Sequence, residues 1–313
     1  MSTGLFSRWR RYPPVQIFLF LLLRSVLMVV DMFPYEMAQK VGIFIGRILG
    51  MLDRRHVRMA TDNLKNAPGV CPPDAIPEFI DRLYGHIGLS IVEMLMIPRL
   101  LDRGLVSDYV TCDNTEIVDE ILKDGRGAII AIGHLGNWEL TGVAVALHGY
   151  RLHSLARPIE NPWIDRYLNR FRTATGQEII SKYRALGPMV RTIQRNELLV
   201  IQIDQDARHV GVFVDFFGRP ASTHRSPAVL SLKYGTPIVP VNIYREGKRH
   251  RCVVTEPFFP DAFRGLPDPV QSLTQAYTQR FEEFVRQHPE QWFWVHNRWK
   301  TTLREVMQAE ALV

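Results

Sequence analysis

The sequence contains little cysteine. Its three cysteines, Cys71, Cys112 and Cys252, lie far apart, and no Cys-x-x-Cys occurs. This spacing indicates neither a disulfide framework nor a zinc site. We therefore expect all three thiols to behave as small buried hydrophobic groups in a reducing compartment.

The compact motifs of several large enzyme classes are also missing. Neither Gly-x-Gly-x-x-Gly nor a Walker loop occurs, which argues against a dinucleotide or ATP enzyme. No Gly-x-Ser-x-Gly supports a Ser-His-Asp hydrolase, and the nearest match, Gly88-Leu89-Ser90, falls within a predicted helix. Without zinc-finger spacing, an aromatic RNA-binding motif or a basic low-complexity arm, we expect no nucleic-acid partner.

The sequence lacks an uninterrupted apolar run of the roughly 20 residues that a clean membrane span needs. The segment Val15 to Phe33 is interrupted by Gln16, Arg24 and Asp31, and no small-x-small cleavage site follows it, so we interpret it as a retained helix. Basic residues on both sides give no inside–outside asymmetry. A helix lying in the membrane interface, or dipping into one leaflet with Arg24 reaching the headgroups, fits best. A full span and a soluble core helix are the alternatives.

The positive charge of the chain is concentrated beside this segment. The net charge is +6, and residues 1–66 hold ten Lys/Arg against four Asp/Glu, while the remainder holds 28 of each. A positive excess beside an apolar segment suggests contact with anionic lipid headgroups rather than with nucleic acid.

The pattern predicts two parts, membrane-associated helices over 1–66 and an α/β domain over 67–313. The break is Ala67-Pro68-Gly69, which is followed by Pro72-Pro73. From Tyr109 onward, apolar β-branched runs alternate with helical patterns, which predicts an α/β fold with a central mixed, mostly parallel sheet flanked by helices. The predicted strands lie at 109–112, 127–132, 152–156, 198–203, 212–216, 238–244 and 252–256. The predicted helices lie at 15–33, 35–52, 54–64, 75–96, 140–147, 163–173, 185–195, 226–234 and 268–288, with another starting at 115.

The chain is organised around Gly133-His134-Leu135-Gly136-Asn137-Trp138-Glu139. It follows a predicted buried strand and precedes a predicted helix, so His134 is expected at a strand-to-helix turn, where open α/β sheets place reactive groups. On one regular helix His134 and Glu139 would lie about 140° apart, so they can meet only if His134 is in the turn and Glu139 in the helix. A carboxylate on one imidazole nitrogen makes the other a better base. We therefore predict a His134–Glu139 catalytic dyad, with an ordinary turn histidine as the alternative.

This stretch resembles the His-x4-Asp/Glu block of the glycerolipid acyltransferase superfamily. In this form it is similar to the late acyltransferases of lipid A biosynthesis, the lauroyl/myristoyl family. Other segments match that family in the same order: Arg55 to Leu64, Ala156-Arg157-Pro158, Asn161-Pro162, Asp204-Gln205-Asp206, Phe216-Phe217-Gly218, Ala221-Ser222-Thr223, Gly235 to Pro240 and Gln291 to His296 followed by Arg298-Trp299-Lys300.

The resemblance implies a membrane-associated O-acyltransferase with no metal and no other cofactor. The acyl chain would pass from acyl carrier protein, less often from coenzyme A, to a hydroxyl of a lipid A precursor. The protein would lie at the inner (cytoplasmic) membrane, in contact with membrane lipids, with its catalytic domain on the cytoplasmic side. Glycerophospholipid, phosphoinositol-mannoside and aminolipid acceptors are alternatives, and so is a non-enzymatic membrane-surface scaffold.

Five further residues are candidates for substrate binding. Arg157, expected at the carboxyl end of a strand, can stabilise an oxyanion or bind a phosphate, or be a surface arginine. Asn161 matches the family but is also placed to cap the next helix. Asp204 and Gln205 follow a buried strand. The carboxylates of Asp204 and Asp206 have no third ligand at a convincing spacing, so we expect hydrogen bonds to a sugar or a loop there rather than a metal. Thr223, at a helix entry, suits either phosphate binding or capping.

Two aromatic groups have open roles. The phenylalanines near 216 can line a slot for the acyl chain or pack in the core, and the tryptophans near the end can lie in the membrane interface or in the core. They are Phe213, Phe216 and Phe217, and Trp292, Trp294 and Trp299.

Overall fold

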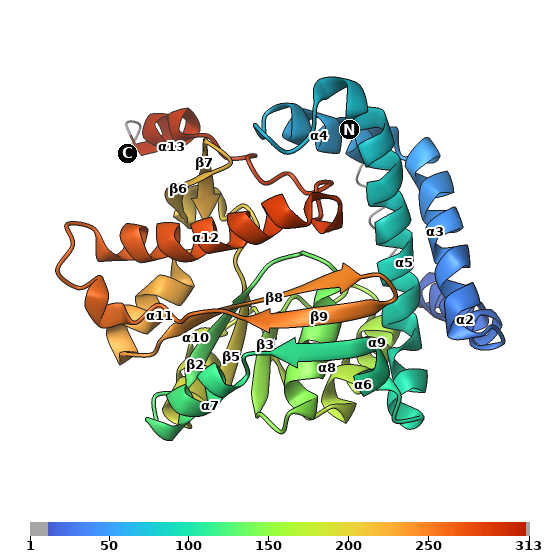
Figure 1. The fold of residues 1–313 in the computed structure, drawn as a ribbon, viewed down its shortest axis with the longest axis horizontal. Coiled ribbons are helices and arrows are strands. Elements are labelled where there is room, and N and C mark those ends of the chain that lie inside the picture. The colour runs from blue at the N-terminus through green and yellow to red at the C-terminus, as the bar shows by residue number, and fades with distance from the viewer. Residues whose placement is uncertain (1–11, 311–313) are drawn as a thin grey trace.

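A seven-stranded sheet forms the centre of the protein in this computed structural model, which describes residues 12–310 (Figure 1). In spatial order its strands are β1 (Val110–Asp113), β9 (Arg249–Val254), β8 (Ile238–Glu246), β2 (Ala128–Ile132), β5 (Leu198–Gln202), β3 (Leu152–Ala156) and β4 (Gln177–Ser181). All neighbours pair in parallel except β8 and β9, which are antiparallel. The predicted mixed, mostly parallel sheet is confirmed.

Helices cover both faces of the sheet. Before the first strand come α2 (Pro13–Asp31), α3 (Tyr35–Leu52), α4 (Arg54–Lys65), α5 (Ile76–Asp102) and α6 (Val106–Tyr109). After it come α7 (Glu116–Lys123), α8 (Trp138–Leu147), α9 (Pro162–Ala174), α10 (Leu186–Gln194), α11 (Ser226–Tyr234), α12 (Pro269–Gln287) and α13 (Leu303–Glu310). A separate antiparallel hairpin pairs β6 (Val212–Phe216) with β7 (Arg219–Thr223), and short 3-10 turns lie at Pro73–Ala75, Arg208–Val210, Pro260–Ala262 and Pro289–Gln291.

The central strand β2 contributes to two hydrophobic cores because its side chains alternate between the faces of the sheet. Ile129 and Ala131 pack on one face with residues from α5, α10, α11 and α12. Ala128, Ile130 and Ile132 pack on the other face with residues from α7 and α8. With both faces covered, β2 is buried along its whole length, which explains why its sequence is continuously apolar.

Most element boundaries agree with the sequence patterns. Strands β3 and β6 and helices α3 and α11 have the predicted bounds. Strands β4 and β7 were missed, because Gln177–Ser181 has only two apolar residues, Ile179 and Ile180, and Arg219–Thr223 contains a proline. Helix α5 continues past the predicted end at Met96, through Pro98, to Asp102.

Glycines allow α3 to approach α5 with backbones in contact. A Cβ on Gly46 would lie 2.1 Å from the carbonyl oxygen of Tyr84, and one on Gly42 would lie 2.9 Å from that of Gly88. The four-residue spacing of Gly42, Gly46 and Gly50 in α3 thus serves close helix packing. The proposed division at residue 67 remains a prediction, but α3 and α5, on either side of it, pack together.

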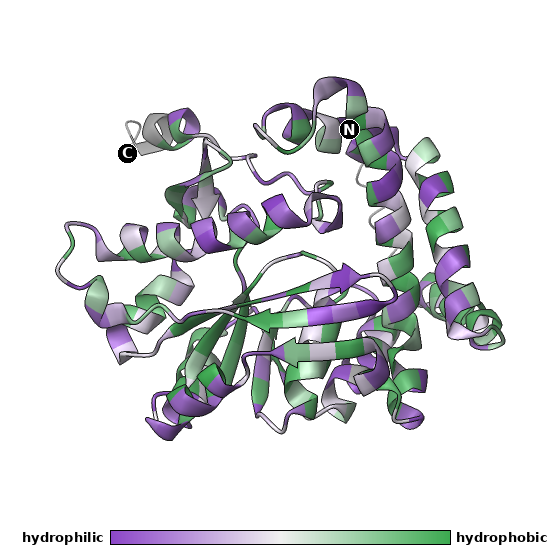
Figure 2. Cartoon of the chain, viewed as in Figure 1, coloured by the Kyte–Doolittle hydropathy of each residue, from purple (hydrophilic) through white to green (hydrophobic). Residues whose placement is uncertain are grey.

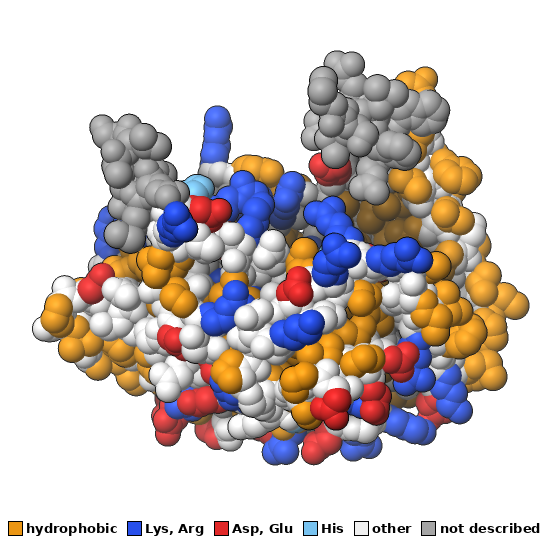
Figure 3. Space-filling view, turned by 90° about the horizontal axis from the view of Figure 1, so that it is seen from above, with side chains coloured by type: hydrophobic (Ala, Val, Ile, Leu, Met, Phe, Trp, Pro, Cys, Tyr) orange, Lys and Arg blue, Asp and Glu red, His pale blue; other side chains and the backbone are white. Residues whose placement is uncertain are grey.

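Helix α2 is long and apolar enough to cross a membrane by length and composition. Only Gln16, Leu27 and Val30 of α2 are buried, so it does not fit the alternative of a core helix. It packs beside α5 and α9 instead of standing apart from them. Helices α2 and α3 lie on the right-hand side in Figure 1, and exposed hydrophobic side chains gather on that side of the molecule in Figure 3, where Figure 2 colours much of the two helices as hydrophobic. The basic flank at Arg8 to Arg11 lies outside the described residues.

We expect Gly46→Ala to destabilise the protein, because the added methyl would collide with backbone atoms of α5. Overpacking of this kind costs about 1–3 kcal/mol of unfolding free energy. Thermal and denaturant unfolding would measure it, with Gly187→Ala on α10 as the control. A Cβ there would meet only the flexible guanidinium of Arg191, at 3.4 Å. Equal stability of the two variants would contradict the close packing of α3 on α5.

Candidate active site

The turn that carries His134 joins the end of β2 to the start of α8, as predicted. Gly136 has a φ of 58°, and a Cβ there would lie 2.3 Å from the carbonyl oxygen of Ile243, so only glycine fits. The chain near residue 292 holds the turn in place. The Gly136 N–H donates to the Gln291 carbonyl (3.0 Å), and the Phe293 N–H donates to the His134 carbonyl (3.0 Å).

Asp204 is the carboxylate that contacts His134. Its Oδ1 lies 2.7 Å from His134 Nδ1, while its Oδ2 accepts the His134 backbone N–H and the Trp292 indole N–H, both at 2.8 Å. The two side chains meet because β2 and β5 are parallel neighbours with Ile132 opposite Gln202, and each residue lies two positions beyond that pair. With Nδ1 as the donor to Asp204, Nε2 of the imidazole carries the lone pair, which the side-chain amide of Gln205 approaches to 3.3 Å.

The pair favours a charged aspartate and a basic imidazole. Burial alone would lower the pKa of His134, but the charge and hydrogen bond of Asp204 raise it above the ordinary value. Burial alone would raise the pKa of Asp204, but the imidazole and the hydrogen bonds to its two oxygens hold it far below the ordinary value. A base of this kind can accept a proton from a substrate hydroxyl.

Glu139 does not make the predicted contact with His134. It lies in the first turn of α8, where its carboxylate binds the Arg172 guanidinium through two hydrogen bonds, 2.7 Å from Nη2 and 3.1 Å from Nε. Burial opposes the charge of Arg172, but the bond to Glu139 raises the pKa of the guanidinium above its usual value. Asp204, and not Glu139, therefore lies beside the imidazole, and Glu139 pairs with Arg172 of α9. The sequence did not reveal that α9 lies close to Glu139.

Arg157 lies close to the Glu139–Arg172 pair. All three line a cavity of about 210 Å³ whose wall includes Trp138. The Trp138 ring also packs edge-on to the imidazole of His134, with 4.8 Å between centroids. Arg157 is exposed, so its guanidinium is open to solvent and to a substrate. Gln205 lies on the other side of the histidine, its Nε2 3.3 Å from His134 Nε2.

Asn161 and Thr223 do not join this site. The Asn161 side chain caps α9, accepting the N–H groups of Trp163 (3.0 Å) and Ile164 (3.3 Å), and it donates to the Gln16 carbonyl. Thr223 is fully buried, with its hydroxyl donating to the Ala221 carbonyl and accepting from the buried Arg298. Their polar atoms are engaged within the fold, which corrects the expectation that they bind substrate.

Five of the aromatic residues with open roles belong to the core. Phe216, Phe217, Trp292 and Trp294 have at most 1% of their surface exposed, and Trp299 has 8%. This excludes the membrane interface for the tryptophans and an acyl slot for Phe216 and Phe217. Trp292 additionally positions Asp204 through its indole N–H.

A buried polar cluster around Glu93 on α5 supports the turn from the other side. Asn137 Nδ2 lies 3.3 Å from Glu93 Oε2, which also contacts Arg245 and, at 3.1 Å, His250 Nε2. Oε1 accepts a hydrogen bond from Gln39 of α3 (2.8 Å). Burial would raise the pKa of Glu93, but His250 and Arg245 hold it at about 2. The carboxylate thus connects α3, α5, β8, β9 and the turn.

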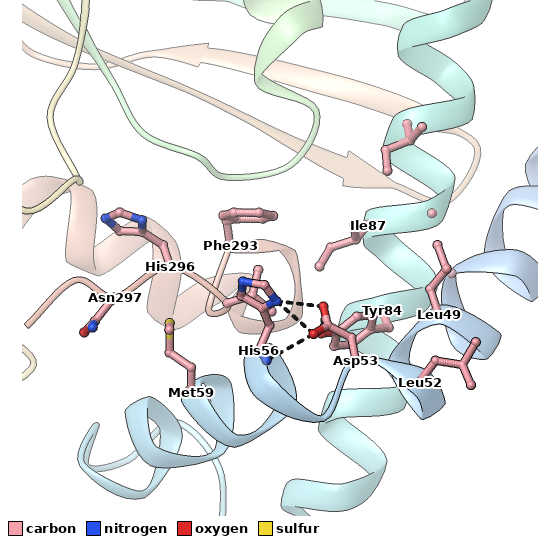
Figure 4. A pocket seen from close by; sticks show the side chains of 14 residues that line it. Leu49, Leu52, Asp53, His56, Met59, Tyr84, Ile87, Phe293, His296 and Asn297 are labelled. Atoms are coloured by element: carbon pink, nitrogen blue, oxygen red, sulfur yellow. Dashed lines mark hydrogen bonds and ion pairs between the residues drawn. The ribbon is translucent and has the colours of Figure 1, made fainter. Parts of the chain in front are cut away.

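Two mainly apolar cavities meet at Phe293, which bonds to the turn. The larger, about 660 Å³, lies between α3, α4, α5 and the segment 293–297, where Leu49, Leu52 and Met59 give it an apolar wall (Figure 4). The smaller, about 270 Å³, is lined by Met94, Trp138 and Trp292. Both share Ile87, Ile91 and Phe293, and the Phe293 ring lies 6.3 Å from the imidazole of His134. Cavities of this size and polarity suit apolar ligands.

Sequence reasoning missed Arg172, Trp138 and Phe293 as neighbours of the site and gave Asp204 a different role. The signal for Asp204 was present, since it follows a buried strand as His134 does. Only the order of strands in the sheet shows that the two are adjacent. In the described part of the chain, no group of three His, Cys, Asp or Glu residues is placed to hold a metal ion.

Comparison with known proteins identifies the chain as an acyltransferase. It belongs to the bacterial lipid A biosynthesis acyltransferase family, which matches residues 6–301. Among its relatives, the phosphatidylinositol mannoside acyltransferase of Mycobacterium tuberculosis (strain CDC 1551 / Oshkosh) is 26% identical over 79% of this chain and 78% of its own length. Lipid A biosynthesis acyltransferase 2 of Shigella flexneri is 26% identical over 87% and 86%, and the lipid A biosynthesis lauroyltransferase of Escherichia coli (strain K12) is 22% identical over 88% and 90%. The scaffold alternative is thereby excluded.

The pH dependence of acyl transfer can distinguish the role of Asp204 from that of Glu139. A histidine base works only when neutral, so kcat/KM should fall as pH drops through the raised pKa of His134. Asp204→Asn removes the group that raises this pKa. We therefore expect the fall of kcat/KM on the acid side of the pH profile to move to lower pH. We also expect kcat to fall by about 10²–10⁴-fold, because the tautomer of the imidazole is no longer fixed.

Glu139→Gln is the matched comparison, since it also neutralises one carboxylate near the turn. It should leave the acid side of the pH profile closer to that of the parent protein, because Glu139 makes the smaller electrostatic contribution to His134. If Glu139→Gln instead produced the larger shift, Glu139 and not Asp204 would be the partner of the base.

Proposed function

We propose that the protein is a membrane-associated O-acyltransferase that moves a fatty acyl chain from a thioester to a glycolipid hydroxyl, with His134 as general base and Asp204 as the residue that orients it. The observation that carries this proposal is the His134–Asp204 pair (2.7 Å) beside two apolar cavities that share the Phe293 wall. Glu139, the partner expected from the sequence, is assigned the positioning of Arg172 instead.

The reaction needs one base and no covalent protein intermediate. Nε2 of His134 accepts the proton of the acceptor hydroxyl while the hydroxyl oxygen attacks the thioester carbonyl. The new ester C–O bond forms as the C–S bond breaks, and the imidazolium returns its proton to the leaving thiolate. Asp204 stabilises the imidazolium between these steps. Arg157, exposed on the neighbouring cavity, is the proposed group for an oxyanion or a substrate phosphate.

The proposed donor is acyl carrier protein, with coenzyme A as the alternative, and the proposed acceptor is a lipid A precursor. Relatives named for lipid A biosynthesis support this acceptor. The relative named for phosphatidylinositol mannoside, matched at the same 26% identity, supports a second candidate. An acidic carrier protein suits a chain with a net charge of +6.

We place the protein at the inner membrane with its catalytic part on the cytoplasmic side. The exposed apolar surface of α3 borders the larger cavity, whose lining includes Gly46, Leu49 and Leu52. A lipid acceptor could therefore approach from the bilayer. The three free cysteines fit a reducing compartment.

The function is tested by mass spectrometry of lipid products. The purified protein would be incubated with acyl carrier protein thioesters, or with acyl-CoA, and with lipid A precursors or phosphatidylinositol mannosides. We expect one acceptor class to gain the mass of one acyl chain. His134→Ala should remain folded and lose at least about 10²-fold in rate, since a general base contributes 10²–10⁴-fold. Turnover retained by this variant would refute the proposed base.

The apolar cavities should set the length of the acyl chain. Ile91, which is 45% exposed and lines both cavities, is the position to fill. We expect Ile91→Trp to shift the preference toward shorter acyl donors, because the added ring takes volume from the slot. A competition assay with donors of mixed length would measure the shift. Leu186→Trp on the exposed surface of α10 is the control, and an unchanged preference in Ile91→Trp would place the chain elsewhere.

A further inference from the structure

A cavity rich in arginine lies at the far end of α5 from the candidate active site. It occupies about 590 Å³ between α2, the carboxyl end of α5 and α9. Four arginines and two aspartates line it, giving a net of two positive charges: Arg24, Arg99, Arg103 and Arg170, with Asp31 and Asp102. By the rise of a helix, Arg103 lies about 24 Å along α5 from Ile87. The cavity is therefore separate from the acyl-transfer site.

Two of the four guanidinium groups are already engaged by the fold. Arg99 donates to the carbonyl oxygens of Asp31 (2.9 Å) and Phe33 (2.8 Å), which secures the end of α2. Arg24 lies 5.1 Å from the centre of the Tyr167 ring. Arg103 and Arg170 have no ion-pair partner within residues 12–310, and both are exposed. They can bind an anion without breaking a contact in the fold.

The cavity borders the apolar surface of α2. Leu21 and Met28, which are 56% and 65% exposed, lie three and four residues from Arg24 and therefore on the adjoining face of the helix. A headgroup in this cavity would have its acyl chains beside that apolar face. A soluble anion without acyl chains would gain no binding energy from this apolar face.

We propose that this cavity binds the phosphate of an anionic phospholipid, which seats α2 and α9 on the membrane surface. The planar guanidinium groups of Arg103 and Arg170 match the paired oxygens of a phosphodiester, and Arg24 adds charge from the side of α2. The inference rests on the membrane association proposed above. It adds a preference for anionic lipid that acyl transfer itself does not require.

Vesicle co-sedimentation of the full chain tests the site without measuring activity. The parent protein should bind vesicles of phosphatidylcholine mixed with phosphatidylglycerol more tightly than vesicles of phosphatidylcholine alone. Arg103→Gln/Arg170→Gln should reduce binding to the mixed vesicles by roughly tenfold, in keeping with the attraction of basic residues to an anionic surface. Binding to phosphatidylcholine alone should stay unchanged, because α2 is intact.

The control is Arg191→Gln/Arg195→Gln, which removes the same charge from the exposed end of α10. Equal weakening by both pairs would reveal a diffuse charge effect and overturn the proposed site. So would an absence of preference for phosphatidylglycerol in a parent protein that binds phosphatidylcholine, a result that leaves membrane association standing. Displacement by soluble glycerol phosphate at constant ionic strength would assign the cavity to a free phosphate and also overturn the proposal.

Discussion

The hydrogen bond between His134 and Asp204 depends on two parallel strands ending at the same edge of the sheet. Because β2 and β5 are neighbours in register, the residues two positions beyond Ile132 and Gln202 emerge side by side. The carboxylate then bonds the backbone, the imidazole and the Trp292 indole at once. One buried charge thereby fixes the turn, the tautomer and the chain segment that closes the site.

That closing segment explains why the aromatic residues near the end of the chain are buried. The N–H of Phe293 and the carbonyl of Gln291 pair with the backbone of the turn, so Trp292 points inward and Phe293 forms a wall of both apolar cavities. The segment covers the imidazole, leaving 11% of its side-chain surface exposed. The Glu93 cluster supports the same turn from α5, so the imidazole is held from two sides of the fold.

The apolar features of the molecule lie together. Helices α2 and α3 carry the exposed hydrophobic side chains, α3 forms part of the larger cavity, and glycine contacts keep α3 tight against α5. Phe293, whose ring lies 6.3 Å from that of His134, lines both candidate acyl cavities, and α3 lines the larger of them. The family shows that the protein is an acyltransferase. The arrangement suggests that a lipid acceptor reaches His134 from the apolar side of the molecule.

The sequence by itself determined the alternation of strands and helices, the turn at His134 and the family, because hydrophobic period, turn residues and local motifs act over a few positions. Only the tertiary structure decided which carboxylate contacts the imidazole. Glu139 is five residues from His134 yet binds Arg172, whereas Asp204 is seventy residues away and bonds the ring. The order of strands in the sheet and the position of Arg172 on α9 make that choice, and neither is encoded in local spacing. Only the tertiary structure also showed that Trp292, Trp294 and Trp299 lie in the core. A tryptophan beside basic residues has the same local sequence pattern in a core as at a membrane surface.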